Sequence, residues 1–240
     1  MIKEKVFVMS DIHGEFEMMK ELLEKWEPKE EQLIILGDLA DRGPNAKEAI
    51  ELAYHLVQKK NAIVIKGNHD DMLEKYLEDP VRNEGLYYIN GGGKTIQSLL
   101  GDAKSESNHK KNAAAIKEKY PWLLSFLKSM RYYYEWADYL FVHAGVDLTL
   151  DDWKDSTKRD FIWIREGFYD QENNTDKTII FGHSVTANLH REYGNYDIWQ
   201  SGDGLIGIDG GAVYGGKLHA LVLSKEGIEK HYFLSNERSR

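Results

Sequence analysis

Five short apolar segments of this chain are each followed, at once or after one residue, by a turn that combines glycine with Asp, Asn or His. The segments are KVFVMS, QLIIL, AIVI, YLFV and TIIF, and the turns are DIHG, GDLADRG, GNHD, HAG and GHS, in that order. Short apolar runs bounded by such turns are typical of buried strands. In an open α/β sheet, ligands bind at the carboxyl ends of the strands. The pattern therefore predicts one polar site on a sheet edge, built from Asp11, His13, Asp38, Asn68, His143 and His183.

The first third of the chain alternates strand and helix patterns. Apolar residues recur at helical spacing over Glu15–Trp26, and a second helix is predicted over Asn45–Lys59, with Pro44 just ahead of it. A third helix is expected to begin near His69. A strand–helix repeat of this kind predicts parallel strands joined by right-handed crossovers.

The rest of the chain has a different organisation. A turn at 90–93 is followed by a mostly helical, polar segment at 93–130, which we interpret as an insert or cap whose last helix opens at Pro121. Residues 131–142 predict a hairpin. Further strands are expected at Thr178–Phe181, Tyr196–Trp199, Leu205–Ile208, Leu218–Leu223 and Ile228–Phe233. Together these patterns predict an α/β fold of two stacked mixed β-sheets flanked by helices, with residues 1–240 forming a single domain.

Composition limits the chemistry that the chain can carry. The sequence has no cysteine, which excludes disulfides, thiolate metal sites and cysteine nucleophiles. The first residues lack the apolar region of a signal peptide, and no run approaches the roughly 20 apolar residues that span a bilayer. We therefore expect a cytoplasmic protein without a membrane partner. A net charge of -9 disfavours nucleic acid as a partner.

The types of residue in the predicted site indicate the class of ion. Mixed carboxylate, amide and imidazole ligands suit manganese, iron or zinc, whereas calcium prefers oxygen ligands and copper prefers sulfur. Asp11 and Asp38 supply about -2 of charge against +4 from two divalent ions, so the centre attracts a phosphate dianion even in an acidic protein. Each motif alone has an ordinary structural explanation, such as a turn or a helix cap. Their shared position at five strand ends argues against that explanation.

These motifs resemble those of the calcineurin-like metallophosphoesterases. The Asp41-Arg42-Gly43 sequence resembles the phosphoprotein phosphatase branch, which includes small bacterial and phage serine/threonine phosphatases and diadenosine tetraphosphatases. The resemblance implies a four-layer sandwich fold. It also implies an enzyme that uses two metal ions, with manganese as the expected metal and iron or zinc as the alternatives. It implies that Asp11, His13 and Asp38 hold one ion, and that Asp38 bridges to a second ion held by Asn68, His143 and His183.

The resemblance also implies the catalytic roles. A metal-bridging hydroxide would attack phosphorus directly, and His69, oriented by Asp41, would protonate the leaving group. Arg42 and Arg165 would bind the phosphoryl oxygens, and Tyr214 is expected near the mouth of the site.

Two residues depart from the pattern of the phosphatase branch, and the substrate stays open. Ser10 stands where that branch usually has Gly, and Asp70 where it usually has Glu, but neither change removes a ligand. The first candidate substrate is phosphoserine or phosphothreonine in a protein, and the second is a dinucleoside polyphosphate such as diadenosine tetraphosphate. A non-catalytic interaction scaffold is the minor alternative. The sequence does not indicate an oligomeric state.

Overall fold

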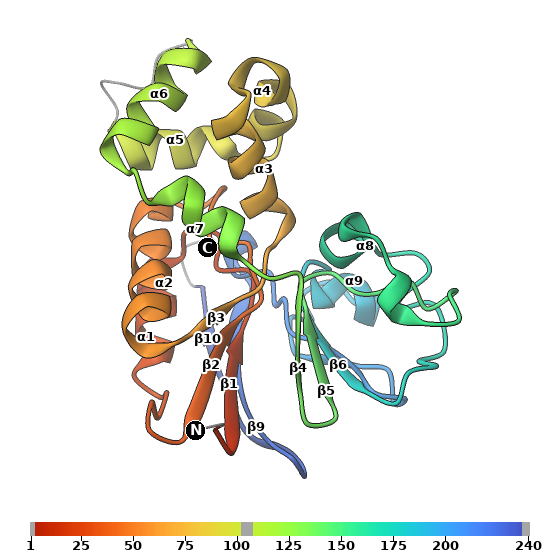
Figure 1. The fold of residues 1–240 in the computed structure, drawn as a ribbon. Coiled ribbons are helices and arrows are strands. Elements are labelled where there is room, and N and C mark those ends of the chain that lie inside the picture. Colours follow the sequence, from red (N-terminus) through yellow and green to blue (C-terminus); the bar gives the residue numbers. More distant parts are fainter. Residues whose placement is uncertain (1–2, 102–107, 237–240) are drawn as a thin grey trace.

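The computed structural model describes residues 3–101 and 108–236, which form two stacked five-stranded sheets flanked by helices (Figure 1). The predicted fold class is therefore confirmed. The first sheet has the order β10 (Gly227–Ser235), β9 (Lys217–Ser224), β1 (Lys5–Met9), β2 (Glu31–Ile35) and β3 (Ile63–Val64). The second sheet has the order β4 (Tyr133–Trp136), β5 (Tyr139–Val142), β6 (Thr178–Phe181), β8 (Leu205–Gly207) and β7 (Trp199–Gln200).

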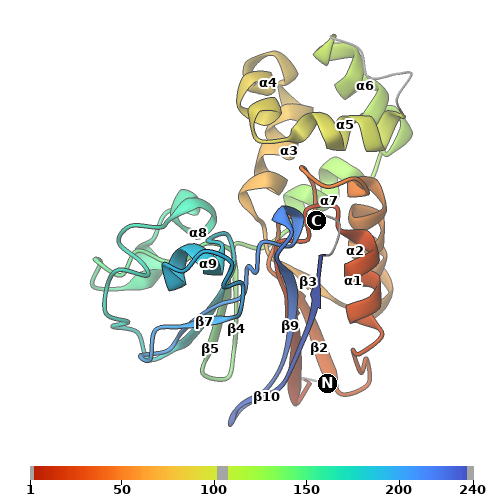
Figure 2. The same cartoon turned by 180° about the vertical axis from the view of Figure 1, so that it is seen from behind.

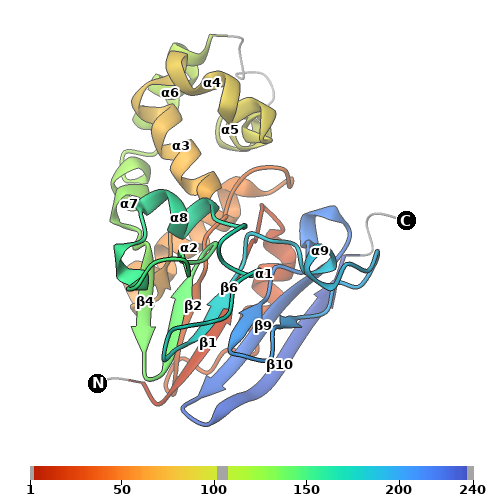
Figure 3. The same cartoon turned by 90° about the vertical axis from the view of Figure 1, so that its right-hand side faces the viewer.

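Both sheets are mixed, as the sequence predicted. In the first sheet β1, β2 and β3 are parallel, while β9 and β10 join antiparallel. In the second sheet β5, β6 and β8 are parallel, and β4 and β7 are antiparallel edge strands. The carboxyl ends of the parallel strands of both sheets point toward the same end of the molecule, where helices rise above the sheets (Figure 3).

Helices form three groups around the sheets. Helices α1 (Phe16–Leu23) and α2 (Ala46–Lys60) cover the outer face of the first sheet (Figure 2). A helical layer rises beyond the strand ends and contains α3 (Asn68–Glu78), α4 (Pro80–Ile89), α5 (Gly92–Leu100), α6 (His109–Lys119) and α7 (Leu123–Ser129). The second sheet carries η1 (Trp153–Asp155), α8 (Lys158–Trp163) and α9 (Thr186–His190), and η2 (Ala212–Tyr214) precedes β9. No helix in these ranges is both long and apolar enough to cross a membrane.

Strand alternation distributes the core between the layers. On β1, Phe7 and Met9 face the helices, whereas Val6 and Val8 lie in the cluster between the two sheets. On β2, Leu33 faces the helices, and Ile34 lies in the cluster between the two sheets. This alternation has a period of two residues, as expected for a strand buried on both faces. Full burial of each such side chain stabilises the fold by roughly 1.5–3 kcal/mol, which makes the strand ends a rigid support for the site.

The structure corrects several predicted boundaries. The helix expected to begin near His69 begins at Asn68 and ends at Glu78. A further helix follows it, because Pro80 lacks an amide hydrogen and Asp79 caps the new start by accepting from the Arg82 amide at 3.2 Å. The helical layer consequently begins well before residue 93. Helix α7 begins at Leu123 rather than at Pro121. Residues 102–107 of the predicted helical segment lie outside the described residues.

The strand predicted at Tyr196–Trp199 is wrong, since β7 covers only Trp199–Gln200. Side chains of β9 hold the preceding residues in a loop instead. The Nε2 atom of His219 lies 2.7 Å from the Tyr196 carbonyl oxygen, and Lys217 pairs with the Asp197 carboxylate at 2.5 Å. These contacts occupy the backbone and side-chain groups of the loop, and they place Tyr196 beside the candidate site.

Candidate metal centre and its cavity

The six predicted metal-binding residues lie at the carboxyl ends of the central strands, as expected. Asp11 and His13 follow β1, Asp38 follows β2, and Asn68 starts α3 just beyond β3. His143 follows β5 and His183 follows β6, so the second sheet supplies the remaining two. All six are at most 8% exposed. Stacking of the two sheets therefore brings together residues that are up to 172 positions apart in the chain.

The backbone at this edge is unusual. Nine non-glycine residues of the described chain have a positive φ, and six of them are predicted site residues. Those six are Asp11, His13, Asp38, Asp41, Arg42 and His183. A left-handed backbone is disfavoured for residues with a Cβ, and such conformations concentrate at functional sites. The turns are therefore shaped to aim these side chains inward at a cost in local conformational energy.

Asp38 lies at the centre of the cluster. Its Oδ2 atom is 3.4 Å from His13 Nε2 and 3.5 Å from His143 Nε2. Two groups of metal-donor atoms share it, and in each group all donor atoms lie within 4.8 Å of one another: His13, Asp38 and His69 in one, and Asp38, His143 and His183 in the other. A shared carboxylate between two donor groups is the arrangement expected of a bridging ligand.

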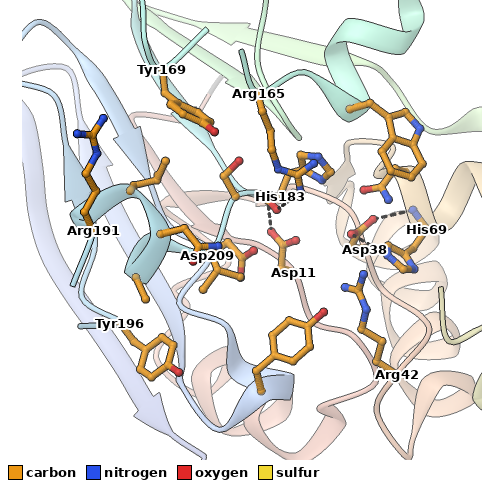
Figure 4. Close-up of a pocket in the computed structure, with 18 of the residues that line it drawn as sticks. Asp11, Asp38, Arg42, His69, Arg165, Tyr169, His183, Arg191, Tyr196 and Asp209 are labelled. Carbon is orange, nitrogen blue, oxygen red and sulfur yellow. Dashed lines mark hydrogen bonds and ion pairs between the residues drawn. The ribbon is translucent and has the colours of Figure 1, made fainter. Parts of the chain in front are cut away.

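Asp11 is fixed beside this centre by hydrogen bonds from two residues. The backbone amide of His183 donates to Asp11 Oδ2 at 3.0 Å (Figure 4). The Ser10 hydroxyl donates to the same oxygen at 2.5 Å. Its other oxygen, Oδ1, lies 4.0 Å from His13 Nε2. The serine that departs from the usual pattern therefore helps to orient a predicted ligand.

Asp70, the second departure, organises the loop that carries Asp38. Its carboxylate accepts from the backbone amides of Asp38 and Gly67, both at 2.9 Å. It also lies 3.3 Å from the amide of Leu39. The shorter side chain at this position thus still ties the turn after β2 to the start of α3.

The imidazole rings are oriented for metal binding by backbone carbonyls. His13 Nδ1 lies 2.8 Å from the Ala40 carbonyl oxygen, and His143 Nδ1 lies 2.6 Å from that of Leu36. A carbonyl only accepts, so both Nδ1 atoms carry the hydrogen and Nε2 presents its lone pair to the centre. His183 Nε2 and His69 Nε2 are buried with no partner among the described residues. Unpaired buried nitrogens are rare, and their presence here fits an edge built to hold cations.

Burial disfavours the charged form of four of the predicted metal ligands. It raises the pKa of Asp11 and Asp38 well above the ordinary value, and it lowers the pKa of His13 and His183 well below theirs. Carboxylates in such a setting gain strongly from a nearby divalent cation, which favours their charged form. The electrostatics and the donor atoms therefore agree on metal binding.

His69, a member of one of the two donor groups, forms a buried pair with Asp41. His69 Nδ1 donates to Asp41 Oδ2 at 2.7 Å, and the His69 amide donates to Asp38 Oδ1 at 2.9 Å. The Nε2 atom of His69 lies 4.0 Å from Asp38 Oδ2. Burial lowers the pKa of His69 and raises that of Asp41 to about 7, while hydrogen bonds from Thr95 and Tyr87 counteract the rise at Asp41.

The two predicted phosphate-binding arginines both reach this edge. Arg42 Nη1 lies 2.7 Å from His13 Nε2, and its guanidinium lies over the ring of Tyr214 at 5.5 Å. Arg165 Nη2 donates to the His183 carbonyl oxygen at 3.3 Å. Tyr214 is 54% exposed and lines the cavity, where it was expected. Positive side chains thus flank the cluster from both sheets.

A cavity of about 850 Å³ contains the cluster and extends well beyond it. Its far lobe is lined by Tyr169, Arg191 and Tyr196, which Figure 4 shows across Asp11 from Arg42 and His69. These three residues are not among the predicted site residues, because nothing in their spacing marks a site. Asp209, a buried carboxylate in the cavity wall, is not among them either, although it follows β8 in the same strand-end position as the predicted ligands.

A chain of two histidines supports the wall of the far lobe. His219 Nε2 donates to the Tyr196 carbonyl oxygen at 2.7 Å, so Nδ1 is free to accept from His231 Nε2 at 2.9 Å. His219 is fully buried. Burial is the main reason that the pKa of His219 falls from 6.5 to about 4.

This histidine is expected to make stability depend on pH. Between pH 6.5 and about 4 the unfolded chain binds a proton at His219 that the folded chain does not, so stability falls as the pH falls. Between pH 7 and pH 5 the loss from this residue is about 2 kcal/mol. Urea unfolding of metal-free protein at both pH values should show a loss smaller by that amount in His219→Gln, whose amide can make both hydrogen bonds. Equal losses in the two proteins would contradict the assignment.

The chain is similar to one protein family and to individual proteins of known name. The calcineurin-like phosphoesterase family profile matches residues 4–208. The bis(5'-nucleosyl)-tetraphosphatase PrpE (asymmetrical) of Halalkalibacterium halodurans is 28% identical over 245 residues, covering 89% of this chain and 88% of that protein. Serine/threonine-protein phosphatase 1 of Salmonella typhimurium is 25% identical over 224 residues, covering 89% of each chain.

Solved structures share the fold over nearly the whole chain. A crystal structure that carries the provisional name diadenosine tetraphosphatase has a TM-score of 0.67 at 18% identity, covering 99% of this chain and 96% of that one. A protein serine/threonine phosphatase from Saccharomyces cerevisiae has a TM-score of 0.59 at 15% identity, covering 96% of this chain and 79% of that one.

Proposed function

The chain belongs to the calcineurin-like phosphoesterases, metal-dependent hydrolases of phosphoric esters with a dinuclear divalent metal centre, and we propose that its substrate is a dinucleoside polyphosphate. One observation carries the catalytic part of this proposal. Two groups of metal-donor side chains share Asp38, and His69, a member of one group, is hydrogen-bonded to Asp41. The substrate class is argued from the shape of the cavity.

The positions of the donor atoms support one ligand set for each ion. We propose Asp11, His13 and Asp38 for the first ion, and Asp38, Asn68, His143 and His183 for the second, with manganese as the expected metal. Bound divalent ions lower the pKa of water and neutralise charge on phosphoryl oxygens. The orientation of His13 and His143 by backbone carbonyls presents Nε2 for this purpose.

The chain's own side chains supply the remaining chemistry. With its Nδ1 hydrogen donated to Asp41, the imidazolium form of His69 carries a second proton at Nε2, which can pass to the leaving oxygen. Arg42 and Arg165 bind the phosphoryl oxygens, since guanidinium groups match their geometry. The buried Asp41 keeps the imidazole in one orientation and stabilises its charged form.

The cavity favours an extended substrate over the phosphoserine or phosphothreonine that the sequence placed first. A single phosphoryl group needs only the end that contains Asp38. The far lobe adds two aromatic rings, Tyr169 and Tyr196, and the cationic Arg191, which suit a nucleobase and further phosphates. The tetraphosphatase name of the Halalkalibacterium relative agrees with this choice.

The substrate proposal is tested by comparing kcat/KM for diadenosine tetraphosphate and for a phosphoserine peptide with manganese present. We expect the dinucleotide to be preferred. Tyr169→Ala should raise KM for the dinucleotide roughly 5- to 100-fold, the range expected for one lost base stack, and leave p-nitrophenyl phosphate unchanged. This small substrate is the internal control, because it occupies only the metal end of the cavity.

The opposite preference would support the second candidate, a protein phosphatase, which the relative from Salmonella favours. Absence of hydrolysis of every substrate, p-nitrophenyl phosphate included, would support the non-catalytic scaffold instead.

A further inference from the structure

The carboxylate of Asp41 is held from two sides. Its Oδ2 atom accepts from His69 Nδ1 at 2.7 Å. Its Oδ1 atom accepts from two hydroxyls of the helical layer, Tyr87 on α4 at 2.9 Å and Thr95 on α5 at 2.6 Å. Asp41, Tyr87 and Thr95 are all fully buried. One oxygen of the carboxylate thus faces the helical layer, and the other faces the imidazole.

Thr95 makes a second contact with the same residue. Its Oγ1 atom accepts from the Asp41 backbone amide at 2.9 Å while its hydrogen goes to the carboxylate. The threonine therefore fixes both the backbone and the side chain of Asp41. A valine of the same shape would fill the space and make neither bond.

The junction between α4 and α5 is built to approach this loop closely. Gly91 has a φ of +99°, and a Cβ there would lie 2.9 Å from Arg42 Cγ. At Gly92 a Cβ would lie 2.5 Å from the Tyr87 ring. Only glycine allows this packing, which seats the Tyr87 ring against the junction and places the junction against the Asp41-Arg42 turn.

An ordinary explanation is that these bonds only satisfy a buried carboxylate. It accounts for the presence of two donors but not for their placement on one oxygen. Because both donors occupy Oδ1, Oδ2 is left to His69, and rotation of the carboxylate is blocked. A group held at a defined angle by surrounding hydrogen bonds is typical of the support behind a catalytic residue.

We propose that Tyr87 and Thr95 are positioning residues, and that α4 and α5 form a clamp which sets the orientation of His69 through Asp41. The helical layer is then part of the catalytic apparatus and not only a cover for the site. The inference rests on the proposed role of His69 in protonating the leaving group.

The kinetic test uses aryl phosphates with different leaving groups. Tyr87→Phe and Thr95→Val should each lower kcat for phenyl phosphate roughly 10- to 100-fold, the usual effect of losing a supporting hydrogen bond. The loss for p-nitrophenyl phosphate should be smaller, because a good leaving group needs less help from a proton donor. Thr95→Ser, in contrast to Thr95→Val, should keep kcat near the wild-type value, since serine keeps the hydroxyl.

Tyr76→Phe is the matched control. Tyr76 is a fully buried tyrosine of the same layer whose ring lies 5.0 Å from that of Tyr87, but its hydroxyl faces His109. The Tyr76→Phe substitution should leave kcat unchanged for both substrates. Equal losses for the two leaving groups, or the same losses in Tyr76→Phe, would overturn the clamp.

A second readout does not depend on activity. In metal-free protein the proton on His69 Nδ1 should give a resonance, assigned by its absence in His69→Asn, that shifts or broadens in Tyr87→Phe and stays in place in Tyr76→Phe. An unchanged resonance in Tyr87→Phe would overturn the clamp. If wild-type protein hydrolyses no ester with metal present but the resonance responds as expected, the proposed function fails, while the orientation of His69 through Asp41 by Tyr87 stands.

Discussion

Replacement of Asp38 by Asn is expected to abolish metal-dependent hydrolysis without unfolding the protein. Asp38 is the only residue common to both groups of metal-donor atoms found among the described residues, so its loss weakens both ion sites at once. The loss of kcat should be at least roughly 10³-fold, equivalent to about 4 kcal/mol of transition-state stabilisation. Metal analysis of the purified variant should show less than the wild-type content of both ions.

Stability measurements separate this effect from misfolding. Burial raises the pKa of Asp38, so the metal-free wild type carries a cost at that position that a neutral amide avoids. The Asn side-chain oxygen can still accept from the His69 amide. We therefore expect metal-free Asp38→Asn to be at least as stable as metal-free wild type but to gain little stability from added manganese. Asp151→Asn, at an exposed loop position, is the control. An undiminished rise in Tm with manganese would contradict the bridging role.

Replacement of His69 by Asn is expected to lower kcat roughly 10²- to 10⁴-fold, the reach of general acid catalysis, while sparing metal content. The reason is geometric, because His69 Nδ1 donates to Asp41 and its Nε2 has no hydrogen-bond partner in the described part of the chain. The loss should be larger for phenyl phosphate than for p-nitrophenyl phosphate. His55→Asn, on the exposed surface of α2, should change neither substrate.

The same variant decides between two roles that the donor distances allow. His69 Nε2 lies within 4.8 Å of donor atoms on His13 and Asp38, so it could bind an ion instead of carrying a proton. A ligand role predicts loss of one metal ion and equal losses for good and poor leaving groups. Unchanged turnover of phenyl phosphate would exclude both roles.

The positions of the predicted site residues could be anticipated because strand ends are marked locally. Apolar runs identified β1, β2, β5 and β6, and the polar residue that follows each run is where a parallel strand delivers its side chain. Asp209 shows the limit of this reasoning. It also follows a strand, but its burial in the cavity wall is a tertiary fact that its place in the sequence does not mark.

Other features had no local mark. The loop around Tyr196 has the composition of a strand, yet contacts from His219 and Lys217 on β9 decide its conformation. The hydroxyls of Tyr87 and Thr95 look like ordinary helix residues in sequence. Their role depends on the folding of α4 and α5 back onto a turn 46 and 54 residues earlier.

The sequence by itself thus determined the ligand types, the alternation of strands and helices, and the edge on which the site would form. These depend on local hydrophobic periodicity and on residues adjacent to each strand. Only the tertiary structure decided which of those residues share Asp38, how the Asp41 carboxylate is held, and how far the cavity extends toward Tyr169 and Arg191. The reason is that such contacts join distant parts of the chain, so they depend on how the two sheets and the helical layer pack and not on the pattern within any one segment.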